Sequence, residues 1–150
     1  MHRLIVATLA LVLAGVPVAA AQSAFSFAIE LSAGAVAAAV PFYAVLYRGS
    51  ASLQSFQASR STEPSTEDIV LGLAVPPLAA GIAVACAGRA FGVTGQLAGA
   101  AAILGASVGE IFALQLWQLD LPDWMKTVAV PVITSLGATI AFNLQGEASR

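Results

Sequence analysis

The sequence predicts an all-α, multi-pass helical membrane protein with about four transmembrane helices behind an N-terminal signal. Hydrophobic residues make up 59% of the 150 residues and charged residues only 9%, whereas soluble domains carry about 25% charged residues. The apolar residues also fall in long blocks rather than alternating with polar ones. Such a chain cannot cover a water-facing surface, so a lipid bilayer is its expected surroundings.

Residues 1–21 have the organisation of a secretory signal peptide. A short basic start precedes an apolar stretch over residues 4–16, and small residues ending at Ala21 follow it. Cleavage after Ala21 leaves Gln22 as the mature N-terminus. The alternative is an uncleaved anchor, but this apolar stretch is shorter than the ~20 residues that a membrane crossing needs.

The mature part, residues 22–150, forms the helical membrane domain. It contains apolar blocks long enough to cross ~30 Å of hydrocarbon as helices, which satisfy their own backbone hydrogen bonds. We expect these helices at residues 25–47, 69–87, 93–116 and 128–144. The last block contains several hydroxyl and amide side chains, so its alternatives are a re-entrant helix or one lying along the membrane surface.

The segments between these blocks predict the connections. Residues 48–68 are polar and lack hydrophobic periodicity, which indicates an exposed loop. Within it, residues 65–68 place a hydroxyl three residues before an acid, as at a helix N-terminus. Gly88 to Gly92 predicts a tight turn, so the second and third helices should form an antiparallel hairpin. Residues 117–126 form an amphipathic connector, whose Trp117 and Trp124 suit the headgroup region of the membrane.

A cleaved signal also predicts the topology. The mature N-terminus would lie outside, which places the loop at 48–68 and the connector at 117–126 inside, and Gly92 and the C-terminus outside. Three of the remaining Lys and Arg residues then lie inside and two outside, in weak agreement with the positive-inside rule.

The third block separates small from large side chains. Small residues recur every four positions on one side, while Leu97, Leu104, Val108 and Ile111 occupy the other. In lipid, small residues let helix backbones approach and gain dispersion contacts. The predicted helix-packing residues are Gly95, Gly99, Ala101, Gly105, Gly109 and Ala113. We expect their partner to be the second helix of the same chain; the alternative is the third helix of another copy.

Through Gly88, Gly92, Gly95, Gly99, Gly105 and Gly109 the chain resembles small bacterial glycine-zipper membrane proteins. The resemblance implies close helix packing and oligomers, and it implies no reaction. The expected partners of the chain are the lipid bilayer and either further copies of itself, as a homo-oligomer, or another membrane protein.

Prolines lie inside three of the four apolar blocks, at Pro41, at Pro76 with Pro77, and at Pro131. Each removes a backbone donor and crowds the preceding turn, so each should kink or break its helix.

Two carboxylates, Glu30 and Glu110, lie within or at the edge of apolar blocks. An ionisable group inside a bilayer is a candidate for proton or ion handling, so both are possible ion-responsive residues. The favoured alternative places each at the membrane surface or in a structural pair. For Glu110 the expected partner is the Ser107 hydroxyl, because Arg89 should lie near the opposite end of the helix, bonded to the last carbonyls of helix two.

Several functions are excluded or disfavoured. After cleavage no histidine remains, the acids do not converge on a nucleophile, and no phosphate or dinucleotide loop appears. We therefore expect no catalytic residues, cofactor or metal. The lone Cys86 should be a small buried side chain. Scattered basic residues offer no patch for nucleic acid.

The sequence thus favours a multi-pass protein of the cell membrane, inner-membrane type, with a structural or accessory role. The alternative is a small transporter or channel component that uses a membrane-embedded carboxylate. An outer-membrane or periplasmic assembly is the alternative location.

Overall fold

The computed structural model describes residues 24–56, 72–116 and 119–148, and every element in them is a helix. This confirms the predicted all-α class. The elements are α2 (Ala24–Phe56), α4 (Val75–Ala90), α5 (Ala98–Gln115) and α6 (Asp123–Ala148). The predicted signal at 1–21, the capping segment at 65–68 and Trp117 lie outside the described residues.

Three of the described helices are long and apolar enough to cross a membrane. Their apolar segments are Ala24–Ala44, Ala98–Gln115 and Asp123–Gly146. The fourth helix, α4, is apolar but has only 16 residues. The fold is therefore that of a multi-pass helical membrane protein, with one helix shorter than the sequence blocks predicted.

Several helix boundaries differ from prediction. Helix α2 continues to Phe56, so residues 48–56, expected in the polar loop, are helical. Helix α4 begins at Val75, with Pro76 and Pro77 in its first positions, where the missing N–H groups cost nothing. Residues 72 and 73 before it are also helical, and the predicted start near residue 69 lies outside the described residues. Both α2 and α6 remain helical through their prolines, and α6 extends beyond the predicted 128–144 at both ends.

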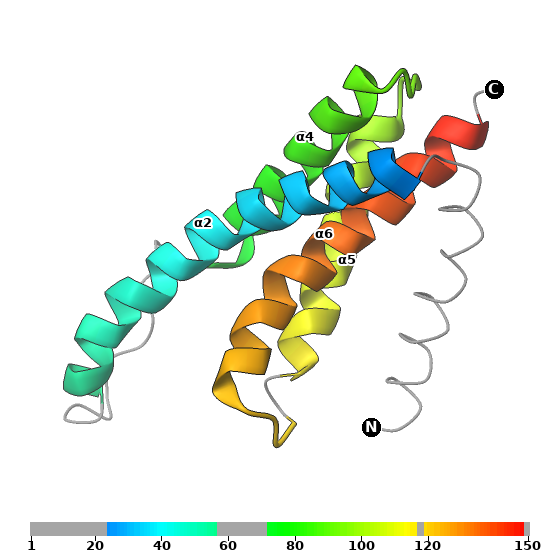
Figure 1. The fold of residues 1–150 in the computed structure, drawn as a ribbon. Helices are drawn as coiled ribbons and strands as arrows, with labels where there is room; N and C mark the ends of the chain where they lie inside the picture. Colours follow the sequence, from blue (N-terminus) through cyan, green and yellow to red (C-terminus); the bar gives the residue numbers. More distant parts are fainter. Residues whose placement is uncertain (1–23, 57–71, 117–118, 149–150) are drawn as a thin grey trace.

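Figure 1 shows α5 and α6 side by side and antiparallel, with α2 crossing them and α4 alongside. The pair α5 and α6 forms the most extensive helix contact. The start of α2, the α4–α5 turn and the end of α6 meet at one end of the bundle. There the rings of Phe25 and Phe91 meet edge to face with centroids 6.2 Å apart.

The turn between α4 and α5 confirms the predicted hairpin. Gly92 has φ of +81°, a conformation that glycine adopts without strain. The carbonyl of Gly88 accepts hydrogen bonds from the backbone N–H groups of Phe91 and Val93, both at 3.1 Å. The backbone N–H of Gly92 donates to the carbonyl of Arg89 at 3.0 Å, which also closes the turn.

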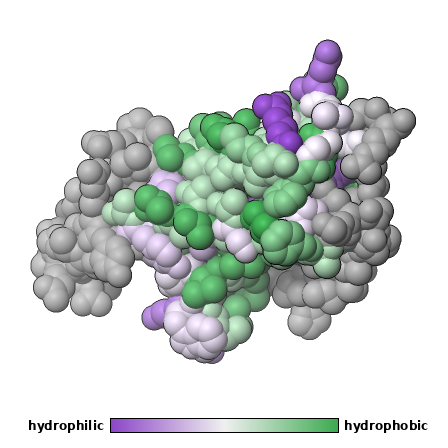
Figure 2. Space-filling model, turned by 45° about the horizontal axis from the view of Figure 1, so that its top comes forward, coloured by the Kyte–Doolittle hydropathy of each residue, from purple (hydrophilic) through white to green (hydrophobic). Residues whose placement is uncertain are grey.

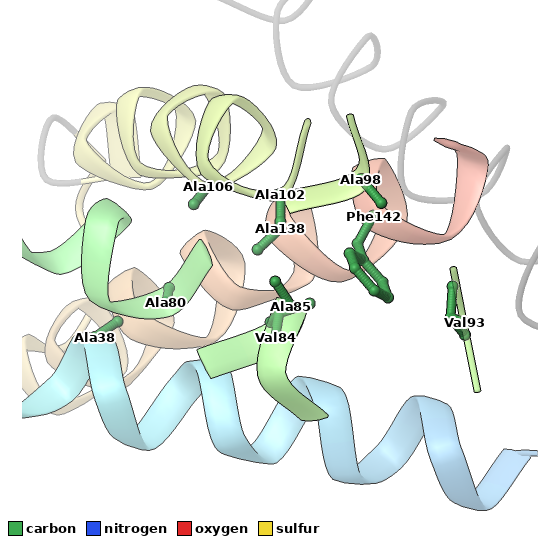
Figure 3. Close-up of a cluster of buried hydrophobic side chains, with 10 residues drawn as sticks. All are labelled: Ala38, Ala80, Val84, Ala85, Val93, Ala98, Ala102, Ala106, Ala138 and Phe142. Atoms are coloured by element: carbon green, nitrogen blue, oxygen red, sulfur yellow. The ribbon is translucent and has the colours of Figure 1, made fainter. Parts of the chain in front are cut away.

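The first core cluster is built almost entirely from small side chains (Figure 3). Its members are Ala38, Val84, Ala80, Ala85, Val93, Ala98, Ala102, Ala106, Ala138 and Phe142. Phe142 is the largest of them, and its ring lies against the Cα of Gly88, where an added Cβ would overlap it. Alanines at this spacing allow close helix approach, which supplies dispersion contacts where lipid supplies no hydrophobic drive.

The second core cluster comprises Phe42, Ala113 and Val130, with Tyr43 and Ile133 packed against it. Phe42 and Tyr43 also stack at a tilt, with centroids 5.8 Å apart. The bundle interior thus has two apolar layers joined along α2, α5 and α6.

The outer surface is broadly apolar, and Figure 2 shows hydrophobic residues across the middle of one face with hydrophilic residues toward its edges. Leu97 and Leu104 are each 68% exposed, and Val108 and Ile111 are also exposed. The predicted separation of large and small side chains on the third helix is therefore correct. Cys86 is exposed on α4 rather than buried, contrary to expectation.

Candidate functional site: a polar layer in the helix bundle

The predicted small-residue face of α5 packs mainly on α6. A Cβ added at Gly105 would overlap the carbonyl oxygen of Gly137, and one added at Gly137 would overlap the carbonyl oxygen of Gly105. A Cβ at Gly109 would lie 2.6 Å from the carbonyl oxygen of Ile133. The partner is thus the fourth block of the same chain, not the second as expected.

The remaining predicted packing residues are less uniform. Ala113 is fully buried in the second cluster, whereas Ala101 is only half-buried. Gly95 precedes α5 and is also half-buried. At Gly99 an added Cβ would meet the nearest atom, a guanidinium nitrogen of Arg89, at 3.6 Å, which is ordinary contact. Close approach is therefore concentrated at Gly105 and Gly109.

Helix α4 meets α5 through a different residue. A Cβ at Gly81 of α4 would lie 2.6 Å from the Cα of Ile103. Helix α2 also has a close contact, since a Cβ added at Gly34 would overlap the side chains of Ser135 on α6 and Val84 on α4. The sequence analysis missed these contacts, along with Gly137. Their signal was small residues at helical spacing, a pattern that alanine-rich helices show at many positions.

Polar side chains of α6 face inward. Thr134, Ser135 and Thr139 are fully buried and Asn143 is 3% exposed. Ser135 Oγ donates to the carbonyl of Leu31 at 2.6 Å, and Thr139 Oγ1 donates to the carbonyl of Ser135 at 2.9 Å. These residues made the fourth block the weakest predicted span, but the structure buries them inside the bundle, where Ser135, Thr139 and Asn143 donate hydrogen bonds.

Glu30 is fully buried and pairs with α6. Asn143 Nδ2 donates to Glu30 Oε2 at 2.7 Å and also to the carbonyl of Thr139 at 2.9 Å. Of the two alternatives for Glu30, the structural pair is therefore observed. The carboxylate ties the start of α2 to the end of α6.

Glu110 is 2% exposed, and neither of its carboxyl oxygens has a hydrogen-bond partner among the described residues. The expected partner was Ser107, but its hydroxyl donates to the carbonyl of Ile103 at 3.0 Å. Thr134 Oγ1 is the other buried side-chain oxygen without a partner in the described part of the chain. Arg89 lies beside Gly99 at the start of α5, as expected. It is therefore far from Glu110 along the helix.

An open apolar groove of about 880 Å³ runs between α2 and α4. Its one polar lining residue is Ser32, whose hydroxyl donates to the carbonyl of Ala28 in its own helix at 2.7 Å. The groove is therefore lined almost entirely by apolar side chains.

Within the described residues no group of three or more His, Cys, Asp or Glu side chains is placed to hold a metal ion. Comparison with protein-family models, with curated proteins and with solved structures finds no match for this chain. Fold and interior together define the class: a multi-pass helical membrane protein with two buried carboxylates, one of them paired with an amide.

Proposed function

We propose that the chain is a structural or accessory protein of the cell membrane, of the inner-membrane type and without enzyme activity. The observation that supports this proposal is the mutual contact of Gly105 and Gly137, which joins α5 and α6 backbone to backbone. Such a contact favours a small rigid unit in lipid. Since these glycines are used within the chain, a partner would meet the outer faces, such as that of Leu104 and Ile111.

Fractionation and native mass test this proposal. Inner and outer membranes are separated on a density gradient, and the particle is then sized in mild detergent. We expect inner-membrane location and a protein mass, after subtraction of bound detergent, of at least twice that of one mature chain, formed with further copies or with another membrane protein. A monomer would contradict the accessory role, and outer-membrane or periplasmic location would contradict the assigned compartment.

The second candidate is a small transporter or channel component that uses a membrane-embedded carboxylate. One observation favours it: Glu110 is buried in a helix long enough to cross a membrane, with both carboxyl oxygens unpartnered among the described residues. Burying an ionisable group at membrane depth costs free energy, so such a residue is a functional candidate by default.

Flux measurements test the second candidate. The protein is reconstituted in vesicles, and proton and monovalent-cation fluxes are compared for wild type, Glu110→Gln and the control Glu30→Gln. We expect a flux that Glu110→Gln abolishes and Glu30→Gln retains, because Glu30 already has an amide partner. Equal fluxes in all three would remove Glu110 from any transport role.

A further inference from the structure

Glu110 lies at the boundary between the two apolar core clusters. On α5, Ala106 one turn before it belongs to the first cluster and Ala113 one turn after it to the second. On α6, Thr134 stands between Ala138 of the first cluster and Val130 of the second. Glu110 and Thr134 therefore occupy the same level of the bundle, which we call the polar layer.

The contact between the two helices supports this alignment. The Cα of Thr134 lies 3.2 Å from the position of a Cβ on Gly109, the residue just before Glu110. Thr134 is also an exception on its helix, since the inward-facing Ser135, Thr139 and Asn143 all donate hydrogen bonds. Two polar groups without a partner among the described residues thus share one level of the bundle.

The chemistry of the polar layer fits a neutral carboxyl group. An ionised carboxylate accepts hydrogen bonds only, and with one hydroxyl as its sole donor its burial remains strongly unfavourable. A protonated carboxyl group carries its own donor, and a threonine hydroxyl both donates and accepts. The pair can therefore satisfy itself when Glu110 holds a proton and the two side chains turn toward each other.

The surroundings of the polar layer favour a proton over a larger cation. The α5 and α6 backbones touch beside it at Gly109, and the open groove lies elsewhere, between α2 and α4. A metal ion would require several oxygen ligands and space for them. A proton requires neither.

Of the other titratable groups that the structure describes, Tyr43 on α2 comes nearest to the polar layer, because it packs against the second cluster. Glu30, also on α2, is bonded to Asn143 toward the other end. On α4, Cys86 is exposed and Arg89 lies in the last turn. On α6, Asp123 and Lys126 belong to the first turn of the helix.

We propose that Glu110 and Thr134 form a proton-binding pair within the bundle, in which the Glu110 carboxyl group holds a proton and the Thr134 hydroxyl is its hydrogen-bond partner. The proton comes from water and returns to it, and no covalent bond changes in the protein. This inference deepens the second candidate function by naming its ligand, and it rests on that candidate for its physiological use.

Infrared spectroscopy of the full chain in lipid tests the proposal. A protonated carboxyl group gives a C=O stretching band distinct from the bands of carboxylates and amides. We expect such a band at neutral pH, lost in Glu110→Gln and retained in Glu30→Gln. Thr134→Val should keep the band but shift it to higher frequency, because the carboxyl group loses its hydrogen-bond partner.

Three results would overturn the proposal: no band that depends on Glu110, no shift in Thr134→Val, or loss of the band when sodium or potassium replaces a large organic cation at constant pH. The last result would assign the site to a metal cation. Thr134→Val keeps the side-chain shape, so it gives an answer even if Glu110→Gln fails to fold.

The flux assay separates this inference from the function on which it rests. A Glu110 band together with no flux would support the proton-binding pair and contradict transport. A flux that requires Glu110, in a protein without the band, would support transport and contradict the pair.

Discussion

At the residue scale, the hydrogen bond from Asn143 to Glu30 joins residues far apart in the sequence and fully inside the bundle. Asn143→Leu removes this donor from a buried carboxylate. We expect the free energy of unfolding in detergent to fall by about 1 to 3 kcal/mol, the usual cost of depriving a buried polar group of a partner. Thermal or denaturant unfolding followed by circular dichroism measures the change.

A matched control lies in the same turn of α6. Gln145 is an exposed amide, so Gln145→Leu changes the same chemical groups without touching Glu30, and its stability should stay close to wild type. If both variants lost the same stability, the cost would come from the helix or the detergent rather than from the buried pair.

At the element scale, the contact between α5 and α6 predicts a sharp difference between two glycines of one helix. Gly105→Ala should destabilise the protein by about 1 to 3 kcal/mol, because the added methyl group meets backbone that cannot move aside. Gly99→Ala adds the same methyl group where the nearest atom is 3.6 Å away, so it should be neutral or slightly stabilising. Unfolding midpoints of the two variants in one detergent provide the comparison.

Gly105→Leu extends the same test. It should prevent folding or assembly, whereas Leu104→Ala should cost little, because Leu104 is 68% exposed and loses only outer contacts. Yield of folded protein after solubilisation measures both. Equal tolerance would mean that the two helices do not touch at this point.

The same elements show what the sequence could predict. The sequence predicted that Gly105 and Leu104 lie on opposite sides of α5, because side-chain size alone distinguishes the two sides of this helix. The partner helix could not be predicted, since both α4, through Gly81, and α6, through Gly137, carry a glycine that allows close approach. Only three-dimensional packing selects between the two helices. Helix α6 appeared weak as a span because average hydropathy does not record that Ser135, Thr139 and Asn143 share one inward row.

The candidate site was predictable in part for a similar reason. Glu110 stands out in an apolar block, but Thr134 is one of many hydroxyl residues in the chain. Only the packing of α5 on α6 shows that Thr134 lies at the same level as Glu110. Local spacing suggested Ser107 instead, whose hydroxyl bonds the preceding turn, as such residues commonly do in helices.

At the scale of the whole molecule, helix α4 raises the question of how often the chain crosses the membrane. Its 16 residues span about 24 Å at 1.5 Å per residue, less than the ~30 Å of hydrocarbon. Yet its last turn lies beside the end of α6, where Phe142 packs on Gly88 and Val93 contacts Gly146. The α4–α5 turn and the end of α6 therefore share one side of the bundle.

Single-cysteine labelling in intact cells tests that arrangement in a Cys86→Ala background. Reporters at Gly92 and Gln145 should react with a membrane-impermeant maleimide from the same side, and a reporter at Asp120, in the α5–α6 connection, only from the other side. Asp120 is exposed in the structure, so its protection in intact cells and labelling after permeabilisation would reflect topology rather than burial. Labelling of Asp120 and Gln145 from one side would mean that α6 does not cross, and the polar layer between α5 and α6 could not then lie at membrane depth.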